Sequence, residues 1–319
     1  MSVMPTARIV EVFAPATIAN LGAGFDILGM AVTEPYDTIH AERVTEPGVV
    51  IAGITGDEGQ LSLESDKNTA GIAAKFVLDQ LRIHEGGVRL RIHKGLPLAS
   101  GLGSSAASAV GAAIAVNALF GNTLRRQELI PACVEAEGAV SGRHADNVAP
   151  ALLGGIVLVT GLTPEDSSRL PVPDGIALAL VTPAVAVPTA EARAVLPKTI
   201  PLGTFVKQSA AVAQLVSAIY SGDLLRMGQA MEGDIIVEPA REHLMPGLKE
   251  VREAARKAGA LATIISGAGP TLCSLCATSN VARLVSEAQA AVYATLGISA
   301  TTHVTTPSLD GATSRIVEP

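Results

Sequence analysis

The run of residues 97–121, PLASGLGSSAASAVGAAIAVNALFG, constrains the possible folds more than any other stretch of this chain. Two glycines and two serines at positions 101–105 precede small, mostly apolar residues at 106–119. Glycine permits tight backbone turns, and serine is favoured at the N-cap of a helix. The first N–H groups of a helix have no acceptor within it, so such an end attracts anions such as phosphate. We therefore predict a phosphate-binding loop that leads into a buried helix; a plain tight turn before such a helix is the alternative.

Two known phosphate-loop patterns fit this run poorly. The P-loop ends in Gly-Lys-[Ser/Thr], and positions 96–120 contain no lysine. The dinucleotide pattern does match Gly101, Gly103 and Ala106. That pattern also needs a second strand ending in an acidic residue about 20 positions later, whereas residues 122–140 read as polar and helical. A nicotinamide or flavin site is therefore disfavoured.

Composition limits the class of protein. A length of 319 residues suggests two domains, and an apolar content of 48% supplies ample core. The net charge of −7 and the aromatic content of 3% argue against a nucleic-acid partner, which calls for basic surface and stacking rings. A membrane partner is not expected, because alanine and glycine contribute little to insertion and Asn117 lies inside the small-residue run. No charged-then-apolar signal opens the chain, so we expect a cytoplasmic location.

The chain contains three cysteines, too few for a secreted disulfide framework. Cys273 and Cys276 form a lone CxxC, whereas a zinc site would need two further ligands. The surrounding segment TLCSLCA reads as an apolar strand, so we predict that these cysteines are buried structural residues.

Hydrophobic periodicity divides the first half into strands and helices. Strands are predicted at 8–14, 37–44, 49–54, 88–93 and 152–159, and helices at 68–81 and 124–140. Residues 161–175 are rich in proline, aspartate and serine, so we place a domain boundary there.

The second half alternates strands and helices. A strand is predicted at 176–181, helices at 205–220, 223–232, 245–258 and 281–296, and a final strand at 302–307. Residues 260–277 read as strand, glycine turn and strand, where the turn at 267–270 either closes a hairpin or approaches the phosphate loop. The fold class predicted is α+β.

Polar residues in apolar surroundings are the candidates for a binding site. Asn20 and Asp26 lie among glycines, which fits either a lined pocket or a turn bonded to its own backbone. Residues 141–147, SGRHADN, precede a predicted buried strand and either line a site or form a solvated loop. Arg193 and Arg241 suit a carboxylate or a phosphate, with ordinary surface arginines as the alternative.

A phosphate loop implies a nucleotide, and phosphoryl transfer needs a divalent metal to spread charge. Mg²⁺ takes hard oxygen ligands, often only one or two from the protein. Ser104 or Ser105 and the carboxylate of Glu137 are the best candidates.

Several segments together resemble a known family. PLASGLGSSAAS is similar to the ATP-binding motif of the GHMP kinases. PATIANLGAGFDILG, SGRHADNVAP, TAEARAVLP, VEPAREHLMPG and ISGAGPT resemble the homoserine kinase branch of that family. These segments extend from about residue 14 to residue 272, so the resemblance covers most of the chain.

The resemblance implies a two-domain GHMP kinase fold. Its N-terminal domain, residues 1–165, would be similar to domain 2 of ribosomal protein S5, and its C-terminal domain, residues 166–319, would be ferredoxin-like. The implied activity is ATP-dependent, Mg²⁺-dependent phosphorylation of the side-chain hydroxyl of L-homoserine in threonine biosynthesis. A homodimer is also suggested by the family.

The resemblance also carries site residues onto this sequence. The ATP-binding residues would be Asn68, Pro97, Leu98, Ala99, Ser100, Gly101, Leu102, Gly103, Ser104, Ser105, Ala106 and Ala107. Ser105 and Glu137 would hold Mg²⁺. The residues that bind the amino acid would be Asn20, Asp26, His144, Asn147, Thr189, Arg193 and Arg241. In that set Asp26 takes the ammonium and the two arginines take the carboxylate, to which their forked donors are suited.

Asn147 would lie beside the reacting hydroxyl, with Ser105 and Glu137 completing the catalytic group. An amide cannot accept a proton as a base, so we expect Asn147 to orient the hydroxyl and the γ-phosphate to take the proton. Asp146 is the nearby carboxylate that would upset this expectation.

The sequence departs from the branch pattern in three places. Only Arg143 separates Ser-Gly from His144, where the family usually has two residues, and Ile18 and Ala23 replace the usual serine and proline. The alternatives considered are a GHMP kinase for mevalonate, a sugar or a diphosphocytidyl polyol, a non-catalytic nucleotide- or RNA-binding module, and a dehydrogenase.

Overall fold

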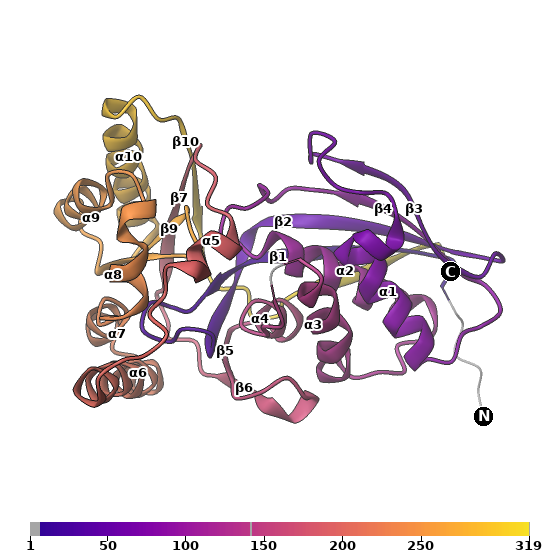
Figure 1. Ribbon diagram of the computed structural model, residues 1–319. Helices are drawn as coiled ribbons and strands as arrows, with labels where there is room; N and C mark the ends of the chain where they lie inside the picture. Colours follow the sequence, from indigo (N-terminus) through magenta and orange to yellow (C-terminus); the bar gives the residue numbers. More distant parts are fainter. Residues whose placement is uncertain (1–6, 141, 319) are drawn as a thin grey trace.

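The computed structural model describes residues 7–140 and 142–318, and two β-sheets form its framework (Figure 1). In the described chain the first sheet has seven strands, with β11-β1-β2-β4-β3 as its main path and β5 and β6 attached through β2. Its strands are β1 (Ile9–Ala19), β2 (Leu28–Val44), β3 (Gly48–Thr55), β4 (Gly87–His93), β5 (Ile156–Val159), β6 (Ser167–Leu170) and β11 (Thr313–Glu318). All pairs are antiparallel except β3 with β4, which is parallel.

Four helices pack with this sheet, and the small-residue helix lies at their centre (Figure 1). They are α1 (Thr69–Gln80), α2 (Ser104–Leu119), α3 (Ile130–Gly138) and α4 (Val148–Leu153). Every residue of α2 except Ser105 is buried, as its uniform apolarity predicts. A Cβ atom on Gly111 would lie 2.5 Å from the Ile39 side chain, so small residues bring α2 close to β2.

The second sheet is antiparallel, in the order β10-β7-β9-β8. Its strands are β7 (Ala177–Pro183), β8 (Ala262–Ile265), β9 (Leu272–Cys276) and β10 (Ala300–Thr305). In chain order they run β7, helices, β8, β9, helix, β10, which is the connectivity and strand order of a ferredoxin-like sheet. The predicted α+β class and the ferredoxin-like second half are confirmed.

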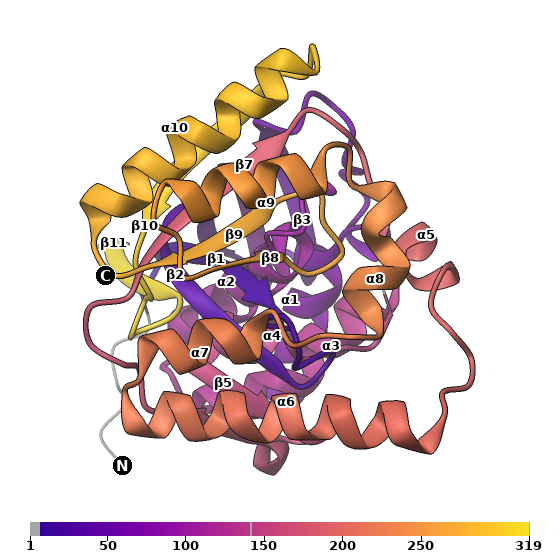
Figure 2. The same cartoon turned by 90° about the vertical axis from the view of Figure 1, so that its left-hand side faces the viewer.

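Most helices of the second half lie on the outer side of its sheet, away from the first sheet (Figures 1 and 2). They are α6 (Leu202–Ser221), α7 (Leu224–Met231), α8 (Val237–Arg241), α9 (Leu248–Lys257) and α10 (Ser279–Thr295). Helix α5 (Thr189–Ala194) lies instead on the side toward the first half (Figure 1). Leu180 of β7 and Ile264 of β8 belong to the same buried apolar cluster as α2, so the two halves share a core.

Three element predictions were wrong in part. Leu152 and Leu153 end helix α4, and the strand begins only at Ile156, after Gly154-Gly155. The helical pattern at 124–140 is a 3₁₀ turn followed by α3, because Pro131 suits the first turn of a new helix. The strand at 302–307 is not the last one, since β11 follows it.

The chain crosses between the sheets at different points from the predicted domain boundary at 165/166. Strand β6 still pairs with β5, and β11 returns from the second half to pair with β1. Residues 167–170 and 313–318 therefore belong to the first sheet, although the predicted division assigns them to the second domain. The return of β11 ties the C-terminal end of the described chain to its first strand.

Candidate active site

The glycine loop connects β4 to α2, and its glycines are required by the protein's own packing. Gly101 and Gly103 have φ of +80° and +68°, a region where other residues are strained. A Cβ atom on Gly101 would lie 2.3 Å from the Ser266 carbonyl oxygen, and one on Gly103 would lie 2.1 Å from Thr17 Oγ1. The loop can therefore adopt its shape only with glycine at both positions.

The turn between β8 and β9 supports the loop from the second half. Ser266 Oγ donates a hydrogen bond to the Gly101 carbonyl (2.7 Å), and the Thr271 N–H donates to the Ser100 carbonyl (3.1 Å). Ser266 and Thr271 are themselves joined by a backbone hydrogen bond of 2.9 Å. The glycine turn thus closes a hairpin and also contacts the loop.

A cavity of about 350 Å³ lies beside the loop and extends to the polar segments of both halves. The predicted site residues that line it are Asn20, Asp26, Asn68, Leu98, Ala99, Ser100, Gly101, Gly103, Ser104, Ser105, Glu137, His144, Asn147, Thr189, Arg193 and Arg241. Four predicted loop residues are not among its lining residues: Pro97, Leu102, Ala106 and Ala107. Leu102, Ala106 and Ala107 are completely buried, so they support the loop from behind.

Helix α2 directs its first turn toward this cavity. Gly103 is its N-cap, and the Ala107 N–H is bonded to the Gly103 carbonyl (2.8 Å). The N–H groups of residues 104–106 precede that first helical bond and have no acceptor within the helix. Together with the positive end of the helix dipole, they are suited to bind an anion, as the sequence predicts.

Ser105 and Glu137 meet at this end of the cavity. Ser105 Oγ donates to Glu137 Oε2 over 3.0 Å, and Glu137 is 6% exposed on α3. Within the described residues, no three histidine, cysteine, aspartate or glutamate side chains gather as a metal site. One hydroxyl and one carboxylate fit a Mg²⁺ ion that takes its other ligands from nucleotide phosphates and water.

The opposite end of the cavity is charged. Arg193 donates to both carboxylate oxygens of Asp26, with Nη1–Oδ2 and Nη2–Oδ1 distances of 3.1 and 2.8 Å. His144 Nδ1 lies 3.7 Å from Asp26 Oδ2. The Asp26 backbone has φ of +60° and its N–H donates to Asn20 Oδ1, so Asn20 fixes the turn that presents the carboxylate. Asn20 and Asp26 therefore belong to a turn bonded to its own backbone and also line the pocket, so both alternatives predicted for them are correct.

Arg241 is the second guanidinium at this end and is only 2% exposed. Its Nε and Nη1 donate to the carbonyls of Ala192 (2.9 Å) and Gly267 (2.8 Å). Burial lowers the pKa of Arg241, and the positive charge of Arg193 lowers it further. The surface-arginine alternative is therefore wrong for Arg241.

Phe25 was missed by the sequence analysis. The guanidinium carbons of Arg193 and Arg241 each lie 5.4 Å from the centre of its ring. One aromatic ring thus stabilises two like charges through cation–π contact. The available signal was a single aromatic residue among the glycines next to Asp26.

The polar cluster after α3 divides between the cavity and the surface. Asn147 Oδ1 accepts a 2.6 Å hydrogen bond from Thr17 Oγ1, which leaves the amide hydrogens for the cavity. Burial lowers the pKa of His144 and raises that of Asp146 to about 7. Arg143 pairs with Glu135 at the surface, and Ser141 lies outside the described residues.

Two predicted residues have local roles as well. Asn68 is the N-cap of α1, where Oδ1 accepts from the Ala70 N–H and Nδ2 donates to the Ser62 carbonyl. Thr189 is the first residue of α5. Both line the cavity, and their contacts with a ligand stay predictions.

The CxxC is structural, as predicted. Cys273 and Cys276 lie in β9 and are buried, and burial raises the pKa of Cys276 to about 12. In the part of the chain that the structure describes, no helix has both the length and the apolarity to cross a bilayer.

Comparison with known proteins agrees with this geometry. The GHMP kinases N terminal domain matches residues 68–155, and the GHMP kinases C terminal domain matches residues 215–295. A homoserine kinase of Chlorobium phaeobacteroides (strain BS1) is 40% identical over 299 residues, 91% of this chain and 93% of that protein. The chain belongs to the homoserine kinases of the GHMP kinase family.

Two further comparisons support the family and its fold. A homoserine kinase of Arabidopsis thaliana is 42% identical over 89% of this chain and 78% of that protein. A crystal structure of homoserine kinase from Cytophaga hutchinsonii superposes with a TM-score of 0.94 at 40% identity, covering 99% of this chain and 100% of that one. The two-domain GHMP kinase fold and the kinase class are thereby confirmed, and the dehydrogenase and non-catalytic alternatives are excluded.

Proposed function

We propose that this kinase transfers the γ-phosphoryl group of ATP to the side-chain hydroxyl of L-homoserine, forming O-phospho-L-homoserine for threonine biosynthesis. One observation carries the proposal. A single cavity has the N-terminus of α2 at one end and a carboxylate with two guanidiniums at the other. The first suits phosphates, and the second suits an amino acid in its zwitterionic form.

The charged end explains the choice of an amino acid over mevalonate or a sugar. Asp26 is the acceptor for an ammonium group, and Arg193 and Arg241 are forked donors for a carboxylate. In the structure Asp26 and Arg193 satisfy each other. A bound zwitterion would exchange this one ion pair for two, so the charges remain compensated throughout binding. A sugar offers no charge to either partner.

Ser105 and Glu137 fit Mg²⁺, and we propose that they hold it beside the phosphates. When bound, the ion would neutralise charge on the β- and γ-phosphates. The contribution of the chain is to hold these two oxygens on α2 and α3 next to the helix N-terminus, where the phosphates would lie.

The transfer itself requires little covalent help from the protein. The homoserine oxygen bonds to the γ-phosphorus, the bond from that phosphorus to the β–γ bridging oxygen breaks, and the hydroxyl proton passes to the γ-phosphate. Asn147 Oδ1 accepts from Thr17, and its two amide hydrogens are available as donors. It can orient a hydroxyl or a phosphate oxygen, and it cannot accept the proton.

The first test is ADP release from Mg-ATP with L-homoserine, L-serine, mevalonate and galactose. We expect turnover with L-homoserine alone. Turnover with mevalonate or galactose, or with none of the four while ATP still binds, would contradict the substrate assignment and leave the phosphate loop standing. A cytoplasmic location stays a prediction, and so does a homodimer, which the family resemblance suggests.

A further inference from the structure

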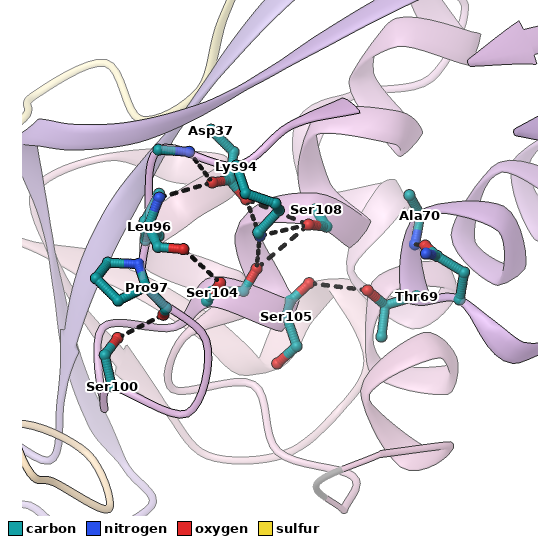
Figure 3. A network of polar contacts seen from close by, with 12 residues as sticks. Asp37, Thr69, Ala70, Lys94, Leu96, Pro97, Ser100, Ser104, Ser105 and Ser108 are labelled. Carbon is teal, nitrogen blue, oxygen red and sulfur yellow. Dashed lines mark hydrogen bonds and ion pairs between the residues drawn. The ribbon is translucent and has the colours of Figure 1, made fainter. Parts of the chain in front are cut away.

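A buried ion pair lies under the base of the glycine loop (Figure 3). Lys94 is the first residue after β4, and Asp37 lies on β2; their side chains are 1% and 0% exposed. Neither residue is apparent from the sequence, because Lys94 precedes the run of residues 97–121 and Asp37 reads as one polar position in an alternating strand.

Lys94 connects the base of the loop to helix α2. Its Nζ atom donates to the Ser104 carbonyl and to Ser108 Oγ, both over 2.8 Å, and pairs with the Asp37 carboxylate. Ser104 and Ser108 are in the first two turns of α2, the end that faces the cavity. Lys94 itself is among the residues lining the cavity.

Asp37 binds the chain where it enters the loop. Its Oδ1 accepts the N–H groups of Gly95 (3.0 Å) and Leu96 (3.1 Å), and its Oδ2 accepts from Ser108 Oγ (3.2 Å). Ser104 Oγ donates to the Leu96 carbonyl over 3.3 Å, which joins the two ends of the loop directly. The incoming strand, the helix and β2 therefore meet at one pair of charges.

Burial lowers the pKa of Lys94, and the nearby Asp37 carboxylate opposes this. The groups that face Lys94 from the packed elements are Asp37 on β2, Ser104 and Ser108 on α2, and more distantly the carboxylates of Glu137 and Asp57. These carboxylates favour the charged form of the ammonium group and partly offset the effect of burial on the Lys94 pKa.

We propose that Asp37 and Lys94 are positioning residues for the nucleotide: they hold the first turn of α2 and the incoming loop in the relative placement that aims the helix N–H groups at the phosphates. This inference rests on the proposed function, because it concerns the same nucleotide end. An anion site made of backbone donors depends on their alignment, and in an active site a misplacement on the order of 1 Å can lower the catalytic rate by about 100-fold. The two charged residues fix that alignment at the base of the loop.

A purely structural role would have a different signature. Removing one partner of a buried pair leaves an uncompensated charge and destabilises the fold, whereas replacing both is much less harmful. If the pair served stability alone, the double variant Asp37→Asn/Lys94→Met would regain both stability and nucleotide affinity. If Lys94 positions α2, the double variant would regain stability and still bind nucleotide weakly.

The test compares the full chain with Lys94→Met, Asp37→Asn and the double variant, by thermal unfolding and by calorimetric titration with Mg-ADP. Asparagine retains an acceptor for the Gly95 and Leu96 amides, so the double variant isolates the loss of the lysine contacts. We expect the single variants to unfold at lower temperature and the double variant to recover most of that loss. We expect the dissociation constant of the double variant for Mg-ADP to be about tenfold or more above that of the parent.

A partly buried ion pair elsewhere in the molecule provides the control. Glu238 of α8 pairs with Arg252 of α9, and Glu238 also accepts the Ile265 N–H, all in the second half of the molecule. The double variant Glu238→Gln/Arg252→Met should change stability and leave Mg-ADP affinity within about twofold, because neither residue contacts the loop.

Ser108→Ala keeps the experiment decisive if Lys94→Met fails to fold. It removes one acceptor of Lys94 and one donor to Asp37, and we expect a smaller rise in the Mg-ADP dissociation constant of about two- to fivefold. Unchanged affinity in Ser108→Ala and in a folded double variant would overturn the proposal. Mg-ADP binding is measured without the amino acid. The affinity data therefore test the positioning role even if L-homoserine is not the substrate.

Discussion

The two ends of the cavity offer different kinds of binding group to a ligand. At the nucleotide end, the donors are backbone N–H groups of one continuous segment, and the side chains are mostly small. At the amino-acid end, the proposed binding groups are charged side chains from the turn after β1, from α5 and from α8. Most substitutions leave a backbone donor in place, and only proline removes it, so the first end is disrupted most directly by adding atoms and the second by removing them.

Gly103→Ala should have the largest effect. The added methyl group would lie 2.1 Å from Thr17 Oγ1 and 2.8 Å from Asn147 Oδ1, in a backbone region with φ of +68°. We expect a stability loss of about 1–3 kcal/mol from strain and a fall in kcat of roughly 100-fold or more, because Asn147 is displaced as well. Thermal unfolding and steady-state kinetics measure the two effects.

Gly203→Ala is the control for Gly103→Ala. Gly203 is in α6, and an added Cβ atom would have no neighbour within 4 Å. Alanine is favoured over glycine in helices, so this variant should be as active as the parent and slightly more stable, by up to about 1 kcal/mol. Equal activity of the two variants would show that the loop does not need glycine at position 103.

Arg241→Ala should break the amino-acid end alone. The truncation removes a buried guanidinium and leaves the Ala192 and Gly267 carbonyls without this donor. We expect kcat/KM for L-homoserine to fall roughly 30- to 1000-fold, which corresponds to about 2–4 kcal/mol of lost transition-state stabilisation. The KM for ATP should stay within about threefold of the parent value. Arg241→Lys should restore little, because an ammonium group lacks the planar fork. A matching rise in KM for ATP would contradict the separation of the two ends.

Asp146→Asn tests whether Asp146 is only a buried carboxyl group or acts as the general base of the reaction. Burial raises the Asp146 pKa from 3.8 to about 7, so between these values the folded state binds more protons than the unfolded state. Stability from this group is therefore lost as pH rises through this range, by at most about 4 kcal/mol at 1.36 kcal/mol per pKa unit. We expect the melting temperature of the variant to exceed that of the parent at pH 8, and by a smaller margin at pH 5.

The kinetics of the same variant test the proton path. We expect kcat at pH 8 to stay within about tenfold of the parent, since transfer proceeds without a strong protein base and general-base catalysis usually contributes 100-fold or more. A loss larger than that, confined to kcat with both KM values unchanged, would identify Asp146 as the base.

Phe25→Leu should have the smallest effect. It removes the ring shared by Arg193 and Arg241, and exposed to partly buried cation–π contacts contribute about 0.5–2 kcal/mol. We expect KM for L-homoserine to rise about three- to tenfold while KM for ATP is unchanged. Phe25→Tyr, which keeps the ring, should behave as the parent; an equal defect in both variants would mean that the packing around residue 25, and not the π face, matters.

The same contrast explains what could be predicted from the sequence. The loop and α2 form one segment whose glycine, serine and alanine content already encodes the turn and the buried helix. Asp26 and Arg193 are 167 positions apart, and residue types alone did not indicate their pairing; the resemblance placed both in one pocket. Phe25, Thr17, Lys94 and Asp37 were missed because each supports a neighbour, and such roles appear only when β1, β2 and α2 are packed together. The return of β11 to β1 was missed for the same reason, since strand pairing across 300 positions leaves no local pattern.

The most direct test of the account compares L-homoserine with two analogues that each lack one charge: 4-hydroxybutanoate, without the ammonium, and 3-aminopropan-1-ol, without the carboxylate. All three carry the reacting hydroxyl. At saturating Mg-ATP, the account predicts that either loss lowers kcat/KM by roughly 100-fold or more, with KM for ATP unchanged. Comparable turnover of either analogue would contradict the assignment of Asp26, Arg193 and Arg241 to the amino acid.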